Sequence, residues 1–231
     1  MGVLVLVRHG ESRWNLCNRF TGWIDVPLSI KGIQEAEACA IHCKKYSYAA
    51  AFTSDLTRAQ STLLIILSQQ ERTGIFQHDD PKYLHWTHSS NKCGSDDLPI
   101  FASDALNERY YGALQGLEKH EAEAEYGAAN VLSWRRSYRA QPPGGESLAE
   151  AHARTTPFLL SEILPRVERG ENIIVTAHGN TLRGIIKHLE GLSDEQIAFV
   201  DLPEAMPLIY DYQDGKYSRI EGEYELNRPL R

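Results

Sequence analysis

The sequence opens with Val3-Leu4-Val5-Leu6-Val7 and continues directly into Arg8-His9-Gly10-Glu11-Ser12. A short, continuous apolar run with β-branched residues at alternate positions is typical of a strand that is buried on both faces. The far half of the chain repeats this arrangement, because Ile173-Ile174-Val175-Thr176 leads into Ala177-His178-Gly179-Asn180. We therefore expect two strands whose carboxyl ends deliver His9 and His178 to one pocket.

Strand-like and helix-like segments alternate along the rest of the chain. Further strands are expected at residues 48–53 and in a C-terminal hairpin of residues 208–212 and 216–220, with Asp214-Gly215 as the turn signal. Helices are expected at residues 29–45, 56–70, 118–126, 130–138, 147–169 and 181–190. Leu63, Leu64 and Leu67 should form the buried face of the second helix. Pro157 and Pro165 should bend or divide the fifth.

This alternation predicts an α/β fold built as a three-layer sandwich, with a mostly parallel mixed sheet and helices on both faces. The C-terminal hairpin makes the sheet mixed. We expect a single domain over residues 1–231, with a polar inserted loop at about residues 77–100, where periodicity is weak. In such sheets ligands bind beyond the carboxyl ends of strands, which is where both His-Gly frames lie.

The composition is that of a globular protein, with 42% hydrophobic and 24% charged residues. A net charge of −7 argues against nonspecific binding to nucleic acid or to an anionic membrane, although a local group of arginines remains compatible with a small anionic substrate. The apolar run at residues 3–7 is too short for a signal peptide or a membrane span. The four cysteines form no Cys-x-x-Cys pair, which suits a reducing compartment, and we expect a cytoplasmic protein.

Two groups of residues invite comparison with metal sites. Cys39 and Cys43 are spaced for one helix face, but they fit small residues on an amphipathic helix better, since His42 points to a different face. A zinc site in the inserted loop would draw on His78, His85, His88 and Cys93. The irregular spacing of these four residues favours a polar loop instead, and we expect no bound metal.

The pocket predicted around the two histidines carries residues suited to phosphoryl transfer. Imidazole is a good nucleophile toward phosphorus, and a second imidazole can support the transferring group. Arginine matches phosphate oxygens bidentately at any working pH, which makes Arg8, Arg58 and the pair Arg135-Arg136 candidates. Taken alone, a histidine after a strand is more often a packed core residue, and these arginines are more often solvated. Only the occurrence of these histidines and arginines together favours a functional site.

Longer motifs show this conjunction. Arg8-His9-Gly10-Glu11-Ser12-Arg13-Trp14-Asn15 resembles the signature of the histidine phosphatase superfamily. Other blocks resemble its cofactor-dependent phosphoglycerate mutases: Asn18-Arg19-Phe20-Thr21-Gly22-Trp23-Ile24-Asp25-Val26-Pro27-Leu28, Thr53-Ser54-Asp55-Leu56-Thr57-Arg58-Ala59, Leu106-Asn107-Glu108-Arg109-Tyr110-Tyr111-Gly112, Trp134-Arg135-Arg136-Ser137-Tyr138 and Ala177-His178-Gly179-Asn180-Thr181-Leu182-Arg183. The resemblance covers nearly the whole chain, and the joint presence of these blocks is specific to that family.

The resemblance implies a role for each matching residue. His9 would be the phosphorylated nucleophile, His178 would stabilise the transferring phosphoryl group, and Glu108 would exchange a proton with the substrate hydroxyl. Arg8 and Arg58 would complete the catalytic set. The implied substrate-binding residues are Arg8, His9, Gly10, Glu11, Ser12, Arg13, Trp14, Asn15, Thr21, Gly22, Arg58, Glu108, Arg109, Tyr110, Tyr111, Lys119, Arg135, Arg136, Gly179 and Asn180. Gly10, which has no Cβ, is expected to let a ligand approach the backbone.

The implied reaction interconverts 3-phosphoglycerate and 2-phosphoglycerate, with no nucleic acid or membrane as partner. Phosphorylated His9 passes its phosphoryl group to the bound monophosphoglycerate, and 2,3-bisphosphoglycerate is both the intermediate and the primer of the phosphoenzyme. Arginines and imidazoles neutralise the phosphate oxygens, so no metal is required. Family members are dimers or tetramers as a rule, and monomers occur, so a homo-oligomer and a monomer both stay open.

A phosphatase of the same superfamily, hydrolysing a small phosphorylated metabolite, is the main alternative. In such an enzyme water would attack the phosphohistidine, and a mutase must keep water out. The family's lid includes the segment after the Trp-Arg-Arg block. Here Arg139 is followed almost at once by Pro142-Pro143-Gly144-Gly145, where many relatives carry a longer and more polar stretch.

Two further alternatives fit less well. The bisphosphoglycerate mutase (synthase) branch favours a glycine and a cysteine-serine pair where this chain has Ser12 and Thr21-Gly22. A binding module without catalysis would be expected to lack at least one of the residues His9, His178, Glu108 and Arg58, and all are present. The sequence therefore favours the glycolytic and gluconeogenic mutase.

Overall fold

One main sheet organises the computed structural model, which describes residues 2–78, 82 and 96–226. Its strands are β1 (Val3–Arg8), β2 (Ala50–Thr53), β3 (Thr73–Gln77), β4 (Asp97–Ala102), β5 (Ile173–Ala177), β7 (Pro207–Gln213) and β8 (Lys216–Glu221). Their spatial order is β3-β4-β2-β5-β1-β7-β8. Neighbours from β3 to β1 run parallel, whereas β7 runs antiparallel to β1 and β8. The predicted mostly parallel mixed sheet is confirmed.

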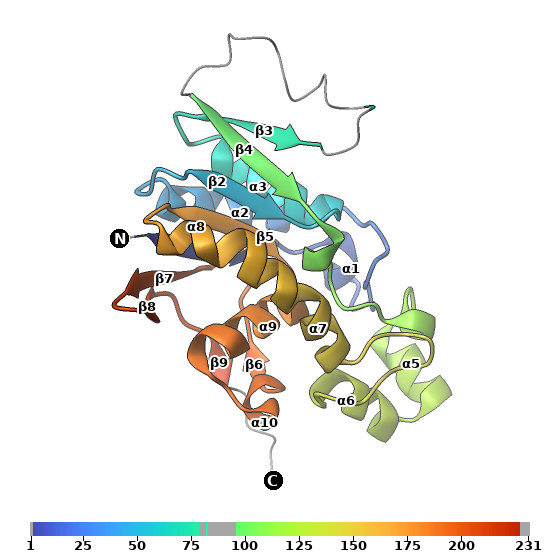
Figure 1. The fold of residues 1–231 in the computed structure, drawn as a ribbon. Helices are drawn as coiled ribbons and strands as arrows, with labels where there is room; N and C mark the ends of the chain where they lie inside the picture. The colour runs from blue at the N-terminus through green and yellow to red at the C-terminus, as the bar shows by residue number, and fades with distance from the viewer. Residues whose placement is uncertain (1, 79–81, 83–95, 227–231) are drawn as a thin grey trace.

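Helices cover both faces of this sheet (Figure 1). Helices α2 (Ile30–Cys43) and α3 (Thr57–Leu67) lie on one face, and α7 (Leu148–Phe158), α8 (Leu164–Glu168) and α9 (Gly179–Glu190) lie on the other. In β1, Leu4 and Leu6 pack into the core under α7 to α9, whereas Val5 and Val7 pack into the core under α2 and α3. A strand whose alternate side chains enter two cores needs an apolar residue at every position, which confirms the three-layer sandwich.

Short elements gather beyond the carboxyl ends of the parallel strands. Helices α5 (Lys119–Tyr126) and α6 (Ala128–Arg136) lie on the side toward which the arrows of β2 and β4 point (Figure 1). They pack on each other and on the loop of Phe20 through Ala122 and Val131. Other short elements are α1 (Arg13–Leu16), α10 (Asp194–Ile197), the 3-10 helices η1 (Asp104–Leu106) and η2 (Gly112–Leu114), and a small pair of strands, β6 (Val200–Asp201) and β9 (Glu225–Leu226).

The buried face of α3 excludes one of the three leucines predicted for it. Leu63 and Leu67 are buried as expected, but Leu64 is 45% exposed and Ile66 takes its place in the core. Residues three and four apart share a helix face, so Ala59, Leu63, Ile66 and Leu67 form one stripe and Leu64 falls beside it. The prediction for Leu64 was therefore wrong.

The predicted long helix of residues 147–169 is divided, as its prolines indicated. Helix α7 ends at Phe158, a five-residue π-helical segment covers Leu159–Ile163, and α8 starts at Leu164. Pro157 lies in the last turn of α7 and Pro165 in the first turn of α8. Proline lacks an N–H group and clashes with the preceding turn, so the regular hydrogen-bond ladder changes between these two residues.

The polar segment predicted at residues 77–100 contains part of the sheet. Gln77 closes β3, and β4 starts at Asp97, with Leu98 and Ile100 fully buried against β2 and β3. The loop prediction was wrong from Asp97 onward, because the alternation of two apolar residues around Pro99 outweighs the polar composition. Three of the four residues on which a zinc site would draw, His85, His88 and Cys93, lie outside the described residues.

Candidate active site

The two histidines meet where the central parallel strands end. The backbone N–H of His9 donates to the carbonyl oxygen of Ala177 over 3.0 Å, which aligns the ends of β1 and β5. The imidazole rings of His9 and His178 lie 5.0 Å apart, centroid to centroid, and both are buried. The predicted juxtaposition of the two His-Gly frames is therefore present in the structure.

His9 is held as a neutral ring with a defined tautomer. Its Nδ1 lies 2.7 Å from the carbonyl oxygen of Gly10. A carbonyl oxygen only accepts, so Nδ1 carries the hydrogen and Nε2 keeps its lone pair. Burial lowers the pKa of His9 well below its usual 6.5, and the charges of Arg58 and Arg8 lower it further. The ring is thus a free nucleophile at neutral pH.

His178 lies behind His9, fully buried and away from the cavity wall described below. Its Nε2 is 2.8 Å from the hydroxyl of Ser54. Its Nδ1 is buried and has no hydrogen-bond partner within the described part of the chain. Burial, followed by the charge of Arg58 and the neighbouring His9, lowers the pKa of His178 well below its usual value. This ring is therefore also neutral, and its Nδ1 makes no hydrogen bond within the described residues.

A cavity of about 260 Å³ opens beside His9. Its walls hold more cations than anions, which suits a small and strongly anionic ligand. The basic residues are Arg8, Arg19, Arg58, Lys119, Arg135, Arg136 and Arg183, the acids are Glu108 and Asp201, and the other lining residues are His9, Asn15, Phe20, Thr21, Gly22, Tyr111, Gly179, Asn180 and Leu202.

Two arginines border His9 and are anchored by backbone carbonyls. Arg58, which is 1% exposed, donates to the carbonyl oxygens of Gly22 at 2.7 Å and Ile24 at 3.1 Å. Burial lowers its pKa to about 10, so it stays charged at pH 7. Arg8 donates to the Leu202 carbonyl at 2.6 Å and to Glu204 at 3.0 Å, while its buried Nε has no partner among the described residues.

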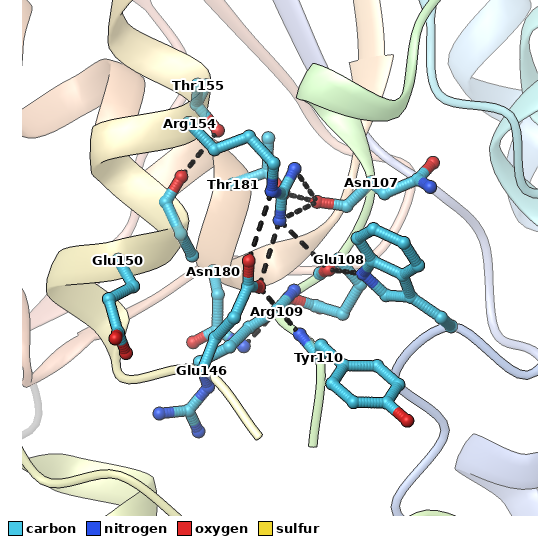
Figure 2. Close-up of polar contacts among 12 residues, drawn as sticks. Asn107, Glu108, Arg109, Tyr110, Glu146, Glu150, Arg154, Thr155, Asn180 and Thr181 are labelled. Carbon is cyan, nitrogen blue, oxygen red and sulfur yellow. Dashed lines mark hydrogen bonds and ion pairs between the residues drawn. The ribbon is translucent and has the colours of Figure 1, made fainter. Parts of the chain in front are cut away.

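Glu108 lies on the cavity wall in a fixed orientation (Figure 2). Its Oε1 accepts from the Nδ2 of Asn180 at 2.8 Å and from the backbone N–H of Arg109 at 2.7 Å. The same Asn180 amide donates to the Tyr111 hydroxyl at 3.1 Å, and Arg183 donates to its Oδ1 at 3.1 Å. Because the Asn180 oxygen is taken by Arg183, its amino group must face the Glu108 carboxylate.

The far wall of the cavity is strongly basic. Burial lowers the pKa of Lys119, and the nearby Arg135 lowers it further. Arg135 and Arg136 lie in the last turn of α6, where the negative end of the helix dipole stabilises cations. Burial lowers the pKa of Arg183 to about 10. The positive charges of these neighbouring side chains repel one another, and a bound anion would offset this repulsion.

Several residues of the implied substrate-binding set do not line the cavity: Gly10, Glu11, Ser12, Arg13, Trp14, Arg109 and Tyr110. Ser12 caps α1 through Asn15, and Glu11 accepts from Ser29 and Lys31. Gly10 faces Gly32 of α2, so its missing Cβ makes room for a helix and not for a ligand. The expectation for Gly10 is therefore corrected.

Arg109 supports the cavity from behind. It is 1% exposed, donates to the Trp134 carbonyl at 2.8 Å and stacks over the Tyr111 ring at 4.6 Å. The hydrogen bond ties Arg109 to the end of α6 and the cation–π contact ties it to Tyr111, while its buried Nε and Nη2 have no hydrogen-bond partner among the described residues. Arg109 thus acts on the basic wall through its neighbours.

The cavity also contains residues that we did not predict from the sequence: Arg19, Phe20, Arg183, Asp201 and Leu202. Arg183 lies three residues after Asn180 on α9, and this helical spacing is the signal that points to it. Asp201 and Leu202 enter through β6 and the residue after it, a strand too short to recognise from its pattern.

Among the described residues, no group of three or more His, Cys, Asp and Glu side chains is placed to hold a metal ion. The Cys39 and Cys43 sulfurs lie 3.8 Å apart, buried on α2. No helix within the described residues is long and apolar enough to span a membrane.

Solved structures support the fold. Mycobacterial hydrolase 1 superposes with a TM-score of 0.76 at 21% identity, covering 96% of this chain and 98% of its own. A putative alpha-ribazole-5'-P phosphatase from Escherichia coli gives a TM-score of 0.71 at 22% identity, covering 95% and 94%. At sequence identities of 21–22%, these matches support the fold and say nothing about the activity.

Sequence comparison is more specific. Residues 4–80 and 89–221 match the histidine phosphatase superfamily (branch 1). The 2,3-bisphosphoglycerate-dependent phosphoglycerate mutase of Methanosarcina acetivorans is 42% identical over 240 residues, covering 96% of both chains. The 2,3-bisphosphoglycerate-dependent phosphoglycerate mutase 2 of Gloeobacter violaceus is 45% identical, covering 95% of this chain and 90% of its own. The chain therefore belongs to branch 1 of the histidine phosphatase superfamily, among the 2,3-bisphosphoglycerate-dependent phosphoglycerate mutases.

Proposed function

We propose that this protein interconverts 3-phosphoglycerate and 2-phosphoglycerate through a phosphohistidine at His9. The observation that carries the proposal is one basic cavity that presents the neutral, buried His9 together with the oriented carboxylate of Glu108. Relatives at 41–45% identity that are named for this reaction support it.

The residues of the cavity fit a 2,3-bisphosphoglycerate primer, which when bound supplies the phosphoryl group that first charges His9. Two buried nitrogens at the site, Arg8 Nε and His178 Nδ1, have no partner within the described chain, which leaves them free for an anionic ligand's oxygens or hydroxyl. Asn15 uses its Oδ1 on Ser12, so its amino group remains as a donor. The groups that would hold the second phosphate and the carboxylate are Lys119, Arg135, Arg136 and Arg183.

The proposed mechanism starts with the Nε2 of His9. As the Nε2–P bond forms, the bond between phosphorus and the substrate oxygen breaks, and the leaving oxygen takes a proton from Glu108. Isomerisation begins when the free hydroxyl of bound 3-phosphoglycerate attacks the phosphorus on His9, the Nε2–P bond breaks and Glu108 removes the hydroxyl proton. The 2,3-bisphosphoglycerate that forms reorients and passes its other phosphoryl group to His9 by the step described above. Dividing the isomerisation into two such transfers lets each proceed in line, which a direct shift between neighbouring carbons does not allow.

The arginines and His178 act on charge. Phosphoryl transfer passes through a loose transition state with negative charge spread over three oxygens, so fixed cations and donors lower the barrier. Arg8 and Arg58 are held by backbone carbonyls before any ligand binds, and no reorganisation is needed during the transfer. In the proposed mechanism these side chains stabilise the charge on the phosphate oxygens, and no metal ion is required for that task.

The proposal is tested by following 3-phosphoglycerate conversion with and without added 2,3-bisphosphoglycerate, with free phosphate measured in the same tube. We expect conversion that the primer accelerates, little free phosphate, and no loss of rate in EDTA. A phosphatase is the second candidate, because only residues 137–147 connect α6 to α7 next to the cavity. Release of free phosphate without isomerisation would establish that candidate and reject the mutase.

A further inference from the structure

Arg154 does not line the cavity, yet its guanidinium holds the turn that carries Glu108 (Figure 2). It projects from α7, and its side chain is 20% exposed. Its Nη1 donates to the carbonyl oxygens of Asp104 at 2.6 Å and Ala105 at 3.1 Å. The two terminal nitrogens lie 3.3 Å from the Asn107 carbonyl oxygen, and Nη2 lies 3.3 Å from that of Glu108. One side chain thus gathers the carbonyls of the turn from Asp104 to Glu108.

Glu146 fixes the plane of this guanidinium from the other side. Its two carboxylate oxygens accept from Arg154 Nε at 3.2 Å and Nη2 at 3.1 Å, a bidentate pair. Glu146 also accepts from the backbone N–H of Tyr110 at 2.9 Å, and its own N–H donates to the Tyr110 carbonyl at 2.7 Å. Glu146 therefore hydrogen-bonds to the backbone two residues after Glu108. Arg154 hydrogen-bonds to the backbone before Glu108 and at Glu108 itself.

Trp23 completes the support of the Glu108 backbone. Its ring lies 5.4 Å from the Arg154 guanidinium carbon, within range of a cation–π interaction. Its Nε1 donates to the Glu108 carbonyl at 2.5 Å, so this carbonyl has two donors. The backbone from which the carboxylate hangs is therefore fixed by side chains from three separate segments.

We propose that Arg154 is a positioning residue for Glu108, and that Glu146 orients the planar guanidinium of Arg154 toward the carbonyl oxygens that it binds. The proposal rests on the proposed function, because it takes Glu108 as the group that exchanges a proton with the substrate. A general acid must lie within about 2.6–3.2 Å of its partner atom, and a displacement of 1 Å costs roughly 10²-fold in rate. A rigid fork that holds several carbonyls at once restricts such displacement.

Arg154→Lys and Glu146→Gln test the inference with modest changes in size. Lysine keeps the charge but lacks the planar fork, and glutamine keeps one acceptor but loses the ion pair. We expect both variants to lower kcat by about 10- to 100-fold, with KM for 3-phosphoglycerate changed less than about threefold. Arg169→Lys is the matched control: Arg169 is 62% exposed, pairs with Glu171 outside the cavity, and should leave kcat unchanged.

A double-mutant cycle with Glu108→Gln separates positioning from general support. If Arg154 acts through Glu108, Arg154→Lys should lower kcat hardly further in the Glu108→Gln background. An equal loss in both backgrounds would overturn the proposal, and so would a full wild-type kcat in Arg154→Lys and Glu146→Gln. Thermal unfolding is measured for each variant, and failure of both to fold would assign the contact to stability and overturn positioning. Absence of conversion by the wild-type protein would instead reject the proposed function.

Discussion

Gly10 and Gly32 pack backbone against backbone where the His9 turn crosses α2. A Cβ added to Gly10 would lie 2.3 Å from the carbonyl oxygen of Gly32, and one added to Gly32 would lie 2.1 Å from that of Glu11. Neither glycine has a positive φ, so both are required by this close approach and not by backbone conformation. The nucleophile is thus held partly by a helix on the opposite side of its turn from the cavity.

Gly32→Ala is expected to destabilise the protein even though it lies in a helix. Replacing glycine by alanine inside a helix gains about 1 kcal/mol from propensity, whereas inserting a methyl group into a closed contact costs about 1–3 kcal/mol. We expect a net loss of about 1 kcal/mol in the free energy of unfolding, measured with urea. Glu37→Ala, on the exposed side of the same helix, is the control. If Gly32→Ala were as stable as wild type, the turn around Glu11 would have to shift without cost, and the close contact would not be required for stability.

His9→Ala should abolish phosphoryl labelling and isomerisation together. The Nε2 lone pair of His9 is the protein nucleophile in the proposed reaction, so its removal is expected to lower the conversion rate at least about 10⁴-fold. Acid-labile label from 2,3-bisphosphoglycerate and conversion of 3-phosphoglycerate are measured in parallel. His188→Ala, an exposed histidine of α9, should keep both. Substantial labelling of His9→Ala would move the nucleophile to another residue.

Glu108→Gln should slow turnover far more than it weakens binding. Glutamine preserves the size of the side chain but neither takes nor supplies the required proton. We expect kcat to fall about 10²- to 10⁴-fold and KM for 3-phosphoglycerate to change less than about threefold. Glu162→Gln, exposed and outside the cavity, is the control, measured in the same steady-state assay. Unchanged turnover would remove Glu108 from the proton transfer.

The local signals in the sequence predicted most of the sheet because they follow directly from burial. The apolar run of β1 and the positive-φ turn at Asp214-Gly215 are features that a window of a few residues contains. Strand β4 was missed because its polar start and Pro99 mask two buried residues, and its place in the sheet depends on β2 and β3. Contacts between distant segments decided that element.

The cavity shows the same division. His9, His178 and Glu108 stand in motifs with specific neighbours, so the chain itself points to them. Arg154 stands in a helix, where arginine is ordinarily solvated, and only the packing of α7 brings it to the Glu108 turn. A sequence motif identifies groups that perform chemistry, whereas the groups that hold them are defined by tertiary structure.

His152 contacts the site from behind and makes the stability of the protein depend on pH. Its Nε2 lies 3.2 Å from the carbonyl oxygen of Asn180 and must donate to it, while its buried Nδ1 has no partner in the described chain. Burial lowers the pKa of His152 from 6.5 to about 4. The folded protein therefore keeps this ring neutral at a pH where the unfolded chain protonates it.

The sign of the resulting pH dependence follows. Below pH 6.5 the unfolded chain binds a proton at this position that the folded protein excludes, so stability is highest above pH 6.5 and falls as the pH drops toward 4. This residue contributes up to about 1.4 kcal/mol per pH unit to the slope. His152→Gln, which retains a donor for the Asn180 carbonyl, should be less stable at pH 7 but show a slope shallower by about that amount. Urea unfolding at several pH values between about 4.5 and 6.5 measures this slope, with the exposed His188→Gln measured in parallel as a comparison. Identical slopes for His152→Gln and wild type would mean that His152 is protonated alike in the folded and unfolded protein, and that its ring is not held neutral behind Asn180.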